Sequence, residues 1–246
     1  MYSMELKVIH LKEIDSTNRY CYKLGKEGKN NLVVIADVQS AGMGRLGRRW
    51  YSNYGGLYFS ILLDLKEYLN NREDSIGKLN FIGSISVYET LIEYLPKNLR
   101  ESIGIKFPND VIVSVNRDKK ICGILSEINW DHKFVVLGIG ININNHIPED
   151  LKDTAVSLRE LCKREYDRFE IFYKFLSRFK DNFHLEDREI LKKYEKYSKT
   201  LGRYVKVVTP NEEITGTVFK IDYGGIYLST LEGIRYINVG DCIHLR

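Results

Sequence analysis

The chain is predicted to be an α+β protein with a mixed, largely antiparallel sheet and a small β-rich segment at its C-terminal end. Strand-like segments precede and follow the first long helical segment, and the helical segments are grouped along the chain. Three consecutive strand-like segments near the middle are separated only by short turns, which is typical of antiparallel hairpins. A regular alternation of strands and helices, which would predict a doubly wound parallel sheet, is not present.

The N-terminal third contains three expected strands and one expected helix. Residues 5–14 alternate roughly between polar and apolar side chains, as a strand does. The sequence DSTN at 15–18 then offers several N-caps for a short helix. Residues 32–38 and 56–65 are rich in apolar side chains and are typical of buried strands. Between them, residues 39–53 contain three glycines and are expected to form a loop.

The middle of the chain predicts a long helix followed by a meander of strands. Asp74 or Ser75 can cap the helix. Its apolar side chains are spaced to face a core and are Ile76, Leu79, Ile82, Ile85, Ile92 and Leu95. Four strands are expected next, at residues 103–106, 110–115, 120–129 and 133–142.

The C-terminal part changes character twice. From about residue 153 the pattern becomes helical, with an apolar stripe formed by Phe169, Phe172, Leu176, Phe179 and Phe183. Residues 199–246 are short β-runs separated by glycines, which predicts a small β-barrel. We therefore expect two domains, 1–198 and 199–246.

Composition excludes several classes of protein. The chain has 246 residues and a formal net charge of +4, with 43% hydrophobic and 12% aromatic residues, which argues against disorder. No apolar run approaches the ~20 residues that span a bilayer, and the N-terminal segment lacks the apolar region of a signal peptide, so no membrane partner is expected. The four cysteines are far apart and form no CxxC pair. A cytoplasmic protein without structural zinc fits best.

The loop QSAGMGRLGRRW at 39–50 is the strongest candidate for a binding site. No acidic residue occurs from Val38 to Leu63, while Arg45, Arg48 and Arg49 lie close together. Glycines allow close backbone approach, and arginines donate bidentate hydrogen bonds to carboxylates and phosphates. The loop matches neither a Walker motif nor a dinucleotide fingerprint. A flexible, solvated surface loop is the ordinary alternative.

Four further segments carry polar residues at positions where a ligand could use them, although each also has an ordinary structural explanation. Ser16, Thr17 and Asn18 could simply cap a helix, and the sequence KFPND at 106–110 could be a common turn. Lys120 opens an apolar strand beside a glycine, and lysines are mostly solvent-exposed. Asn142 interrupts an apolar strand and needs partners from a ligand or from the protein. The histidines show no metal-ligand or catalytic spacing, and we expect them to be structural or exposed.

Taken together and in this order, the five segments resemble the motifs of biotin protein ligases. The motifs here are STN at 16–18, GMGRLGRRW at 42–50, KFPND at 106–110, KICGIL at 120–125 and GIGIN at 138–142. The resemblance covers essentially the whole chain, because an SH3-like β-barrel is expected at residues 200–246. It implies a class II synthetase-like catalytic domain at 1–198 and this barrel at 199–246.

The resemblance implies an ATP-dependent ligase. Such enzymes activate biotin as biotinyl-5′-AMP, with Mg²⁺, and transfer it to a lysine of a biotin carboxyl carrier protein. Family members that also act as repressors carry an additional N-terminal DNA-binding domain. Only about fifteen residues precede Ser16, so we expect a monofunctional ligase that has no DNA partner. Family members are often dimers, which makes a homodimer an expectation of the same kind.

The resemblance also assigns residues. Biotin would be bound by Ser16, Thr17, Asn18, Gln39, Met43, Gly44, Arg45 and Lys120, and ATP by Arg48, Trp50, Asn109, Lys120 and Asn142. Trp50 is expected near adenine. Lys120 would lie between the biotin carboxylate and the α-phosphate and, with Arg45, would be catalytic. No dedicated protein metal site is expected, although Asn109 could help to place a metal ion or the nucleotide. Met43 and Leu46 replace two arginines of the family's loop, so any contact made by those arginine side chains is absent.

Two other functions stay open. Lipoate or octanoate ligases share the catalytic fold but bear a different Arg-Arg-Gly-Gly-type loop, so the loop at 39–50 favours biotin. A non-enzymatic RNA-binding protein, using the arginines and the barrel, is the second alternative.

Overall fold

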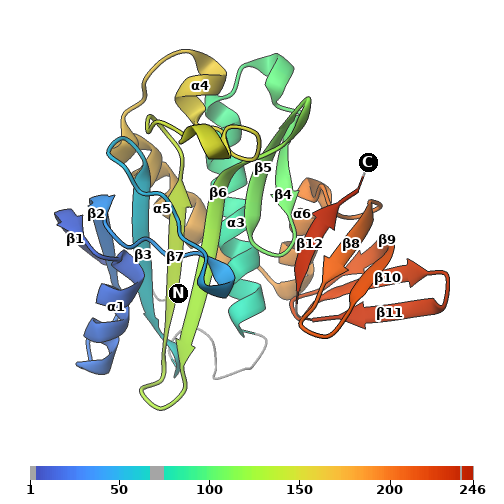
Figure 1. Ribbon diagram of the computed structural model, residues 1–246. Coiled ribbons are helices and arrows are strands. Elements are labelled where there is room, and N and C mark those ends of the chain that lie inside the picture. Colours follow the sequence, from blue (N-terminus) through green and yellow to red (C-terminus); the bar gives the residue numbers. More distant parts are fainter. Residues whose placement is uncertain (1–3, 67–74, 239, 246) are drawn as a thin grey trace.

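A seven-stranded sheet forms the centre of the larger part of the molecule (Figure 1). The computed structural model describes residues 4–66, 75–238 and 240–245. The strand order is β1-β2-β3-β7-β6-β5-β4. The strands are β1 (Lys7–Ile14), β2 (Leu32–Gln39), β3 (Leu57–Asp64), β4 (Ile103–Lys106), β5 (Asp110–Val115), β6 (Arg117–Asn129) and β7 (Phe134–Ile141).

The sheet is mixed, and the predicted α+β class is confirmed. β1 and β2 pair in parallel and are connected by helix α1 (Thr17–Lys26). All other neighbouring strands in this sheet pair in antiparallel fashion. Ser16 is the N-cap of α1, because its side chain accepts a hydrogen bond from the backbone N–H of Arg19. The β5–β6–β7 meander has the predicted order, and its first turn contains Asn116 in the left-handed region (φ 64°).

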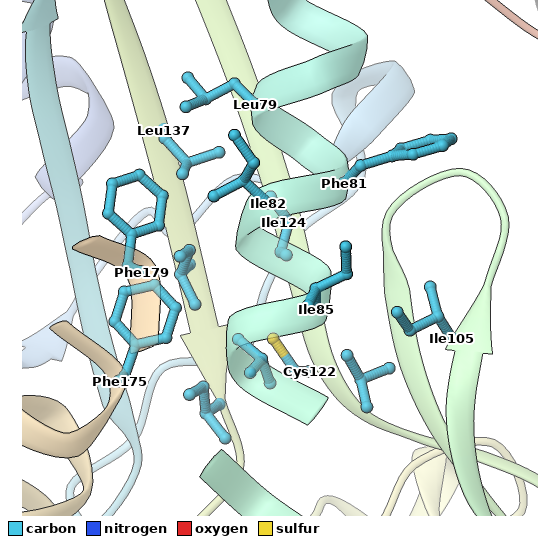
Figure 2. Close-up of a cluster of buried hydrophobic side chains, with 14 of the residues drawn as sticks. Leu79, Phe81, Ile82, Ile85, Ile105, Cys122, Ile124, Leu137, Phe175 and Phe179 are labelled. Atoms are coloured by element: carbon cyan, nitrogen blue, oxygen red, sulfur yellow. The ribbon is translucent and has the colours of Figure 1, made fainter. Parts of the chain in front are cut away.

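The main core lies between one face of the sheet and helices α3 (Ser75–Tyr94), α5 (Arg168–Phe183) and α6 (Asp187–Tyr197). Side chains of α3 and α5 meet those of β6 and β7, as Figure 2 shows for Ile82, Leu137 and Phe179. Of the six residues predicted to face the core from α3, Ile76 and Ile92 are only half-buried. The Asp74 cap lies outside the described residues.

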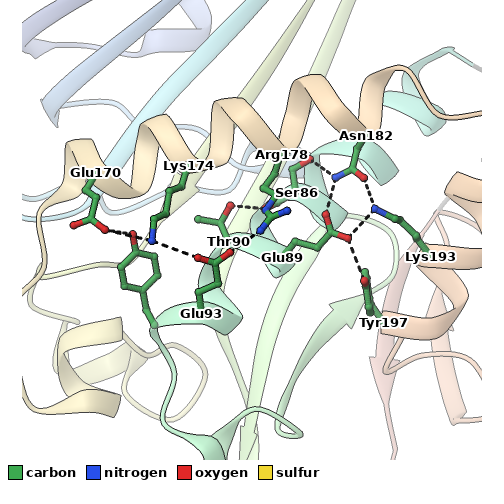
Figure 3. Close-up of polar contacts among 11 residues, drawn as sticks. Ser86, Glu89, Thr90, Glu93, Glu170, Lys174, Arg178, Asn182, Lys193 and Tyr197 are labelled. Carbon is green, nitrogen blue, oxygen red and sulfur yellow. Dashed lines mark hydrogen bonds and ion pairs between the residues drawn. The ribbon is translucent and has the colours of Figure 1, made fainter.

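A polar network joins these three helices (Figure 3). The Glu89 carboxylate of α3 accepts hydrogen bonds from the side chains of Asn182 on α5 and of Lys193 and Tyr197 on α6. Because each donor comes from a different turn or helix, the carboxylate holds the helical layer together.

The opposite face of the sheet is covered by α1 only in part. Cys21 of α1 packs on Val34, Leu62 and Val136 in a second, smaller cluster. Further along β6 and β7 this face carries Gly123, Leu125, Gly138 and Gly140, which line a cavity.

The C-terminal strands form a separate five-stranded sheet of order β11-β10-β9-β8-β12. The predicted β-rich segment is therefore confirmed, while closure into a barrel stays a prediction, since the described residues show no pairing of β11 with β12. The division at 198/199 falls between α6 and β8 and also stays a prediction. The strands are β8 (Tyr204–Val208), β9 (Glu213–Ile221), β10 (Ile226–Thr230), β11 (Gly233–Ile237) and β12 (Asp241–His244).

Short elements complete the connections. Helix α4 (Leu158–Cys162) begins with a capping box formed by Ser157 and Glu160. The 3-10 turns are Arg45–Gly47, Lys97–Leu99 and Glu149–Leu151. Among the described residues, no helix is both long and apolar enough to cross a membrane.

Candidate active site

One cavity of about 510 Å³ lies on the α1 side of the large sheet. The loop between β2 and β3 crosses in front of the sheet here (Figure 1). All twelve residues that the sequence analysis assigned to ligands line this cavity: Ser16, Thr17, Asn18, Gln39, Met43, Gly44, Arg45, Arg48, Trp50, Asn109, Lys120 and Asn142. Segments that are far apart in the sequence are thus brought to one place.

The cavity floor consists of glycines on β6 and β7, because side chains from other segments pack directly against the backbone of these strands. Gly123 of β6 pairs with Gly140 of β7, and the Trp50 indole lies against both. A Cβ atom on Gly140 would overlap this indole, and one on Gly138 would overlap the Asn18 amide. The glycines of the KICGIL and GIGIN motifs therefore leave room for the side chains that line the cavity.

A buried set of hydrogen bonds forms one end of the cavity. The backbone N–H and the hydroxyl of Thr17 donate to Gln39 Oε1, at 2.8 and 3.0 Å. The Asn18 amide donates to Glu127 Oε2 at 2.8 Å and accepts from the Ser60 hydroxyl at 2.6 Å. These bonds fix the orientation of the two amides, so a ligand at this end meets donors and acceptors already in position.

The glycine-rich loop brings cations over the floor. Arg45 donates to Asn109 Oδ1 at 3.3 Å, and burial lowers the pKa of its guanidinium. Arg48 is ion-paired with Asp241 at the start of β12. The turn between these arginines has positive φ at Leu46 and Gly47, and the Leu46 side chain points into solvent. Leu46 therefore takes no part in the cavity.

Lys120 and Trp50, which both line the cavity, lie next to each other. The Lys120 ammonium is 2.6 Å from Asp110 Oδ1 and 5.1 Å from the centre of the Trp50 ring. The buried Trp50 Nε1–H finds no acceptor among the described residues. A buried donor without a partner is costly, so this N–H is available to a ligand.

Asn142 already has a protein partner. Its side chain is buried, and its Oδ1 accepts a hydrogen bond from Asn145 Nδ2 at 3.0 Å. Of the two explanations that the sequence left open, the structural hydrogen bond is therefore present.

Three carboxylates of the cavity were not assigned from the sequence. Asp110 belongs to the KFPND motif, and Asp118 lies two residues before Lys120, so both could have been found by their positions. Asp241 comes from the C-terminal sheet and has no signal in the sequence. The described residues contain no group of three or more His, Cys, Asp or Glu side chains able to hold a metal ion.

A glycine-floored cavity with fixed cations and a lysine–carboxylate pair suits the binding of a carboxylate or a phosphate. Residues 11–144 match the model of the biotin/lipoate A/B protein ligase family. The chain belongs to this family.

Individual relatives agree with the family model. The Bacillus subtilis (strain 168) bifunctional ligase/repressor BirA is 29% identical, over 93% of this chain and 71% of that protein. The biotin–[acetyl-CoA-carboxylase] ligase of Mycobacterium tuberculosis is 28% identical, over 88% of this chain and 80% of that protein. Among solved structures, the Aquifex aeolicus biotin protein ligase in complex with biotin and ATP is similar with a TM-score of 0.80 and 35% identity, covering 98% of this chain and 99% of that one.

Proposed function

We propose that the chain is a biotin protein ligase. A carboxylate oxygen of biotin attacks the α-phosphorus of ATP, which forms biotinyl-5′-AMP and releases pyrophosphate. The amine of a lysine on a biotin carboxyl carrier protein then attacks the acyl carbon, which forms an amide and releases AMP. The observation that carries this proposal is the convergence of all five motifs on one cavity, together with the likeness to a ligase described with biotin and ATP.

The hydrogen-bonded end of the cavity suits the ureido ring of biotin. The ring offers two N–H donors and one carbonyl acceptor, and it needs complementary groups once it is removed from water. Ser16, Thr17, Asn18 and Gln39 present hydroxyl and amide groups there. We assign these four residues to the ring and Met43 to biotin as well, whereas Gly44 is assigned with Arg45 to the carboxylate and adenylate side.

The cations suit the two anions that react. Bringing a carboxylate to a phosphate requires positive charge that is already in position. Lys120 lies against Asp110 and near the Trp50 ring, and Arg45, which donates to Asn109, lines the same cavity. We assign Lys120 to the biotin carboxylate and the α-phosphate, and Arg45 to stabilising the intermediate.

The remaining assignments concern ATP. Arg48, Trp50, Asn109 and Asn142 line the cavity and are assigned to the nucleotide. Magnesium usually binds through one or two carboxylates, with phosphate oxygens and water completing its shell. Asp110 supplies such a carboxylate beside Lys120, so the residues fit a Mg²⁺ ion that arrives with ATP. The ion would neutralise phosphate charge.

The decisive experiment is exchange of labelled pyrophosphate into ATP, measured with and without biotin. We expect exchange that depends on biotin, and transfer of biotin to a lysine of an apo carrier domain. Lipoate and octanoate serve as competing acids in the same assay. Exchange that depends on either of them and not on biotin would assign the chain to the other branch of the family, and retention of RNA without any exchange would favour the RNA-binding alternative.

Compartment and assembly complete the proposal. The four cysteines are free thiols, three of them buried, which fits a reducing cytoplasm. We propose a homodimer, because the resemblance implies one, and sedimentation velocity tests it.

A further inference from the structure

His244, near the C-terminal end of the chain, joins the C-terminal sheet to the large sheet. It is the last residue of β12, the edge strand that faces the large sheet (Figure 1), and its side chain is 5% exposed. Its Nδ1 lies 2.7 Å from Asp118 Oδ2 on β6, and its Nε2 lies 3.0 Å from Thr200 Oγ1. The imidazole therefore bridges two segments of the chain.

The hydrogen bonds of this bridge run in one direction. The backbone N–H of Phe107 donates to Thr200 Oγ1 at 2.9 Å, which leaves the Thr200 hydroxyl to donate to His244 Nε2. The ionised Asp118 needs a donor, so the proton of the neutral imidazole is on Nδ1. Asp118 also accepts from the Ser114 hydroxyl at 2.7 Å. Each polar group of this bridge thus has a partner when His244 is neutral.

Both ends of the bridge lead into the candidate active site. Phe107 is the second residue of the KFPND turn, which ends at Asp110. Asp118 lies two residues before Lys120 on the same strand, and it lines the cavity itself. The bridge therefore holds the two backbone segments that carry the Lys120–Asp110 ion pair.

We propose that His244 is a positioning residue for the adenylation step. It fixes the KFPND turn and the beginning of β6 relative to each other, and so it sets the position of the Lys120 ammonium at the reacting carboxylate and phosphate. It touches neither substrate. The inference rests on the proposed function, and it gives the C-terminal sheet a part in the first half-reaction.

The location of the bridge predicts which kinetic constant changes. The ureido end of the cavity is built by α1 and Gln39, and none of the bridge contacts involves them. Small displacements of reacting groups cost about tenfold or more in rate. Replacing His244 should therefore lower kcat for biotin-dependent pyrophosphate exchange by about tenfold or more, while the Kd of biotin stays within about twofold of the wild-type value.

The test compares three variants. His244→Leu removes both hydrogen bonds, and His244→Gln keeps an acceptor that can reach Thr200. Val205→Ala is the matched control, because Val205 pairs with residue 244 in the sheet and is buried, but is outside the bridge. All three should lower Tm, while only the His244 variants should lower kcat, with His244→Gln retaining more activity than His244→Leu.

The outcomes separate the two proposals. Wild-type protein without biotin-dependent exchange would defeat the proposed function. Active wild-type protein, with a kcat of His244→Leu equal to that of Val205→Ala at matched Tm, would overturn the positioning role. A fall in kcat accompanied by an equal loss of biotin affinity would also overturn it, because that pattern indicates general distortion of the cavity.

Discussion

The guanidinium of Arg48 is ion-paired with the carboxylate of Asp241, although 193 residues separate them in the sequence. The pair joins the glycine-rich loop to the first residue of β12, at the rim of the cavity. Arg45 of the same loop also donates to the backbone carbonyl of Gly240 at 3.4 Å. The C-terminal sheet therefore holds the loop over the floor on which substrates would bind.

Asp241→Asn should shorten the lifetime of the bound adenylate. The Arg48 side chain is 63% exposed, so the ion pair contributes only ~0–1 kcal/mol. This limits the effect to about fivefold faster release. Release can be followed by stopping the reaction at intervals and measuring the adenylate that is still bound. Glu232→Gln, in the exposed turn between β10 and β11, is the control for loss of charge. An unchanged lifetime would mean that the ion pair does not hold the loop.

Lys120→Ala should abolish adenylate formation and leave the fold intact. Removing a positioned cation from the reacting centre costs about 100-fold or more in rate. Because the Lys120 side chain is 32% exposed, its loss leaves no unfilled core. Pyrophosphate exchange and Tm are the measurements. Lys119→Ala is the neighbouring control, because the Lys119 ammonium donates to the backbone carbonyl of Lys152 and not to Asp110. Near-normal exchange by Lys120→Ala would refute its assignment.

Gly140→Ala should weaken ligand binding. Its Cβ would overlap the Trp50 indole, and overpacking of this kind costs about 1–3 kcal/mol. Since Trp50 lines the cavity, we expect the cost to reduce the affinities for biotin and ATP, measured by calorimetry. Gly83→Ala in α3 is the control, because a Cβ atom added there would lie 3.4 Å from its nearest neighbours, which is ordinary van der Waals contact. Equal affinities for Gly140→Ala and the wild type would show that the glycine floor is not required.

Acidification should destabilise the wild type more than His244→Gln. Burial lowers the pKa of His244 below its ordinary value, and this outweighs the hydrogen bond from its ring to Asp118. Among the charges that act on it, Lys106 on β4 and Arg203 before β8 lower the pKa, while the charge of Asp118 raises it. An unfolded histidine takes up a proton as the pH falls through about 6.5. The folded histidine resists protonation, so the free energy of unfolding of the wild type decreases as the pH is lowered through that range.

Urea unfolding of both proteins between about pH 5 and pH 7.5 tests this sign. Asp118 stays ionised throughout, because hydrogen bonds from Ser114 and His244 lower its pKa despite burial. The stability difference between wild type and His244→Gln should shrink as the pH falls. A constant difference would indicate that the imidazole does not titrate with folding.

Local sequence was sufficient to predict most of the fold. The alternation of residues 5–14, the DSTN caps and the aromatic stripe of α5 are properties of one segment each, and each produced the expected element. The parallel pairing of β1 with β2 was not specified, because a crossover helix as short as α1 gives no separate signal of strand direction. Ile76 and Ile92 are only half-buried, because the helical periodicity of apolar residues does not show where the surface that packs against the helix ends.

The sequence by itself determined most of the elements, the five motifs and twelve of the residues that line the cavity, because each is encoded within a few neighbouring positions. Only the tertiary structure decided how those residues contact one another. Strand pairings and the packing of the two sheets produce these contacts. Lys120 is ion-paired with Asp110, Trp50 packs against Gly123 and Gly140, and His244 is hydrogen-bonded to Asp118. Sequence separation carries no information about such contacts, because strand register and the docking of β12 bring together groups as much as 193 residues apart.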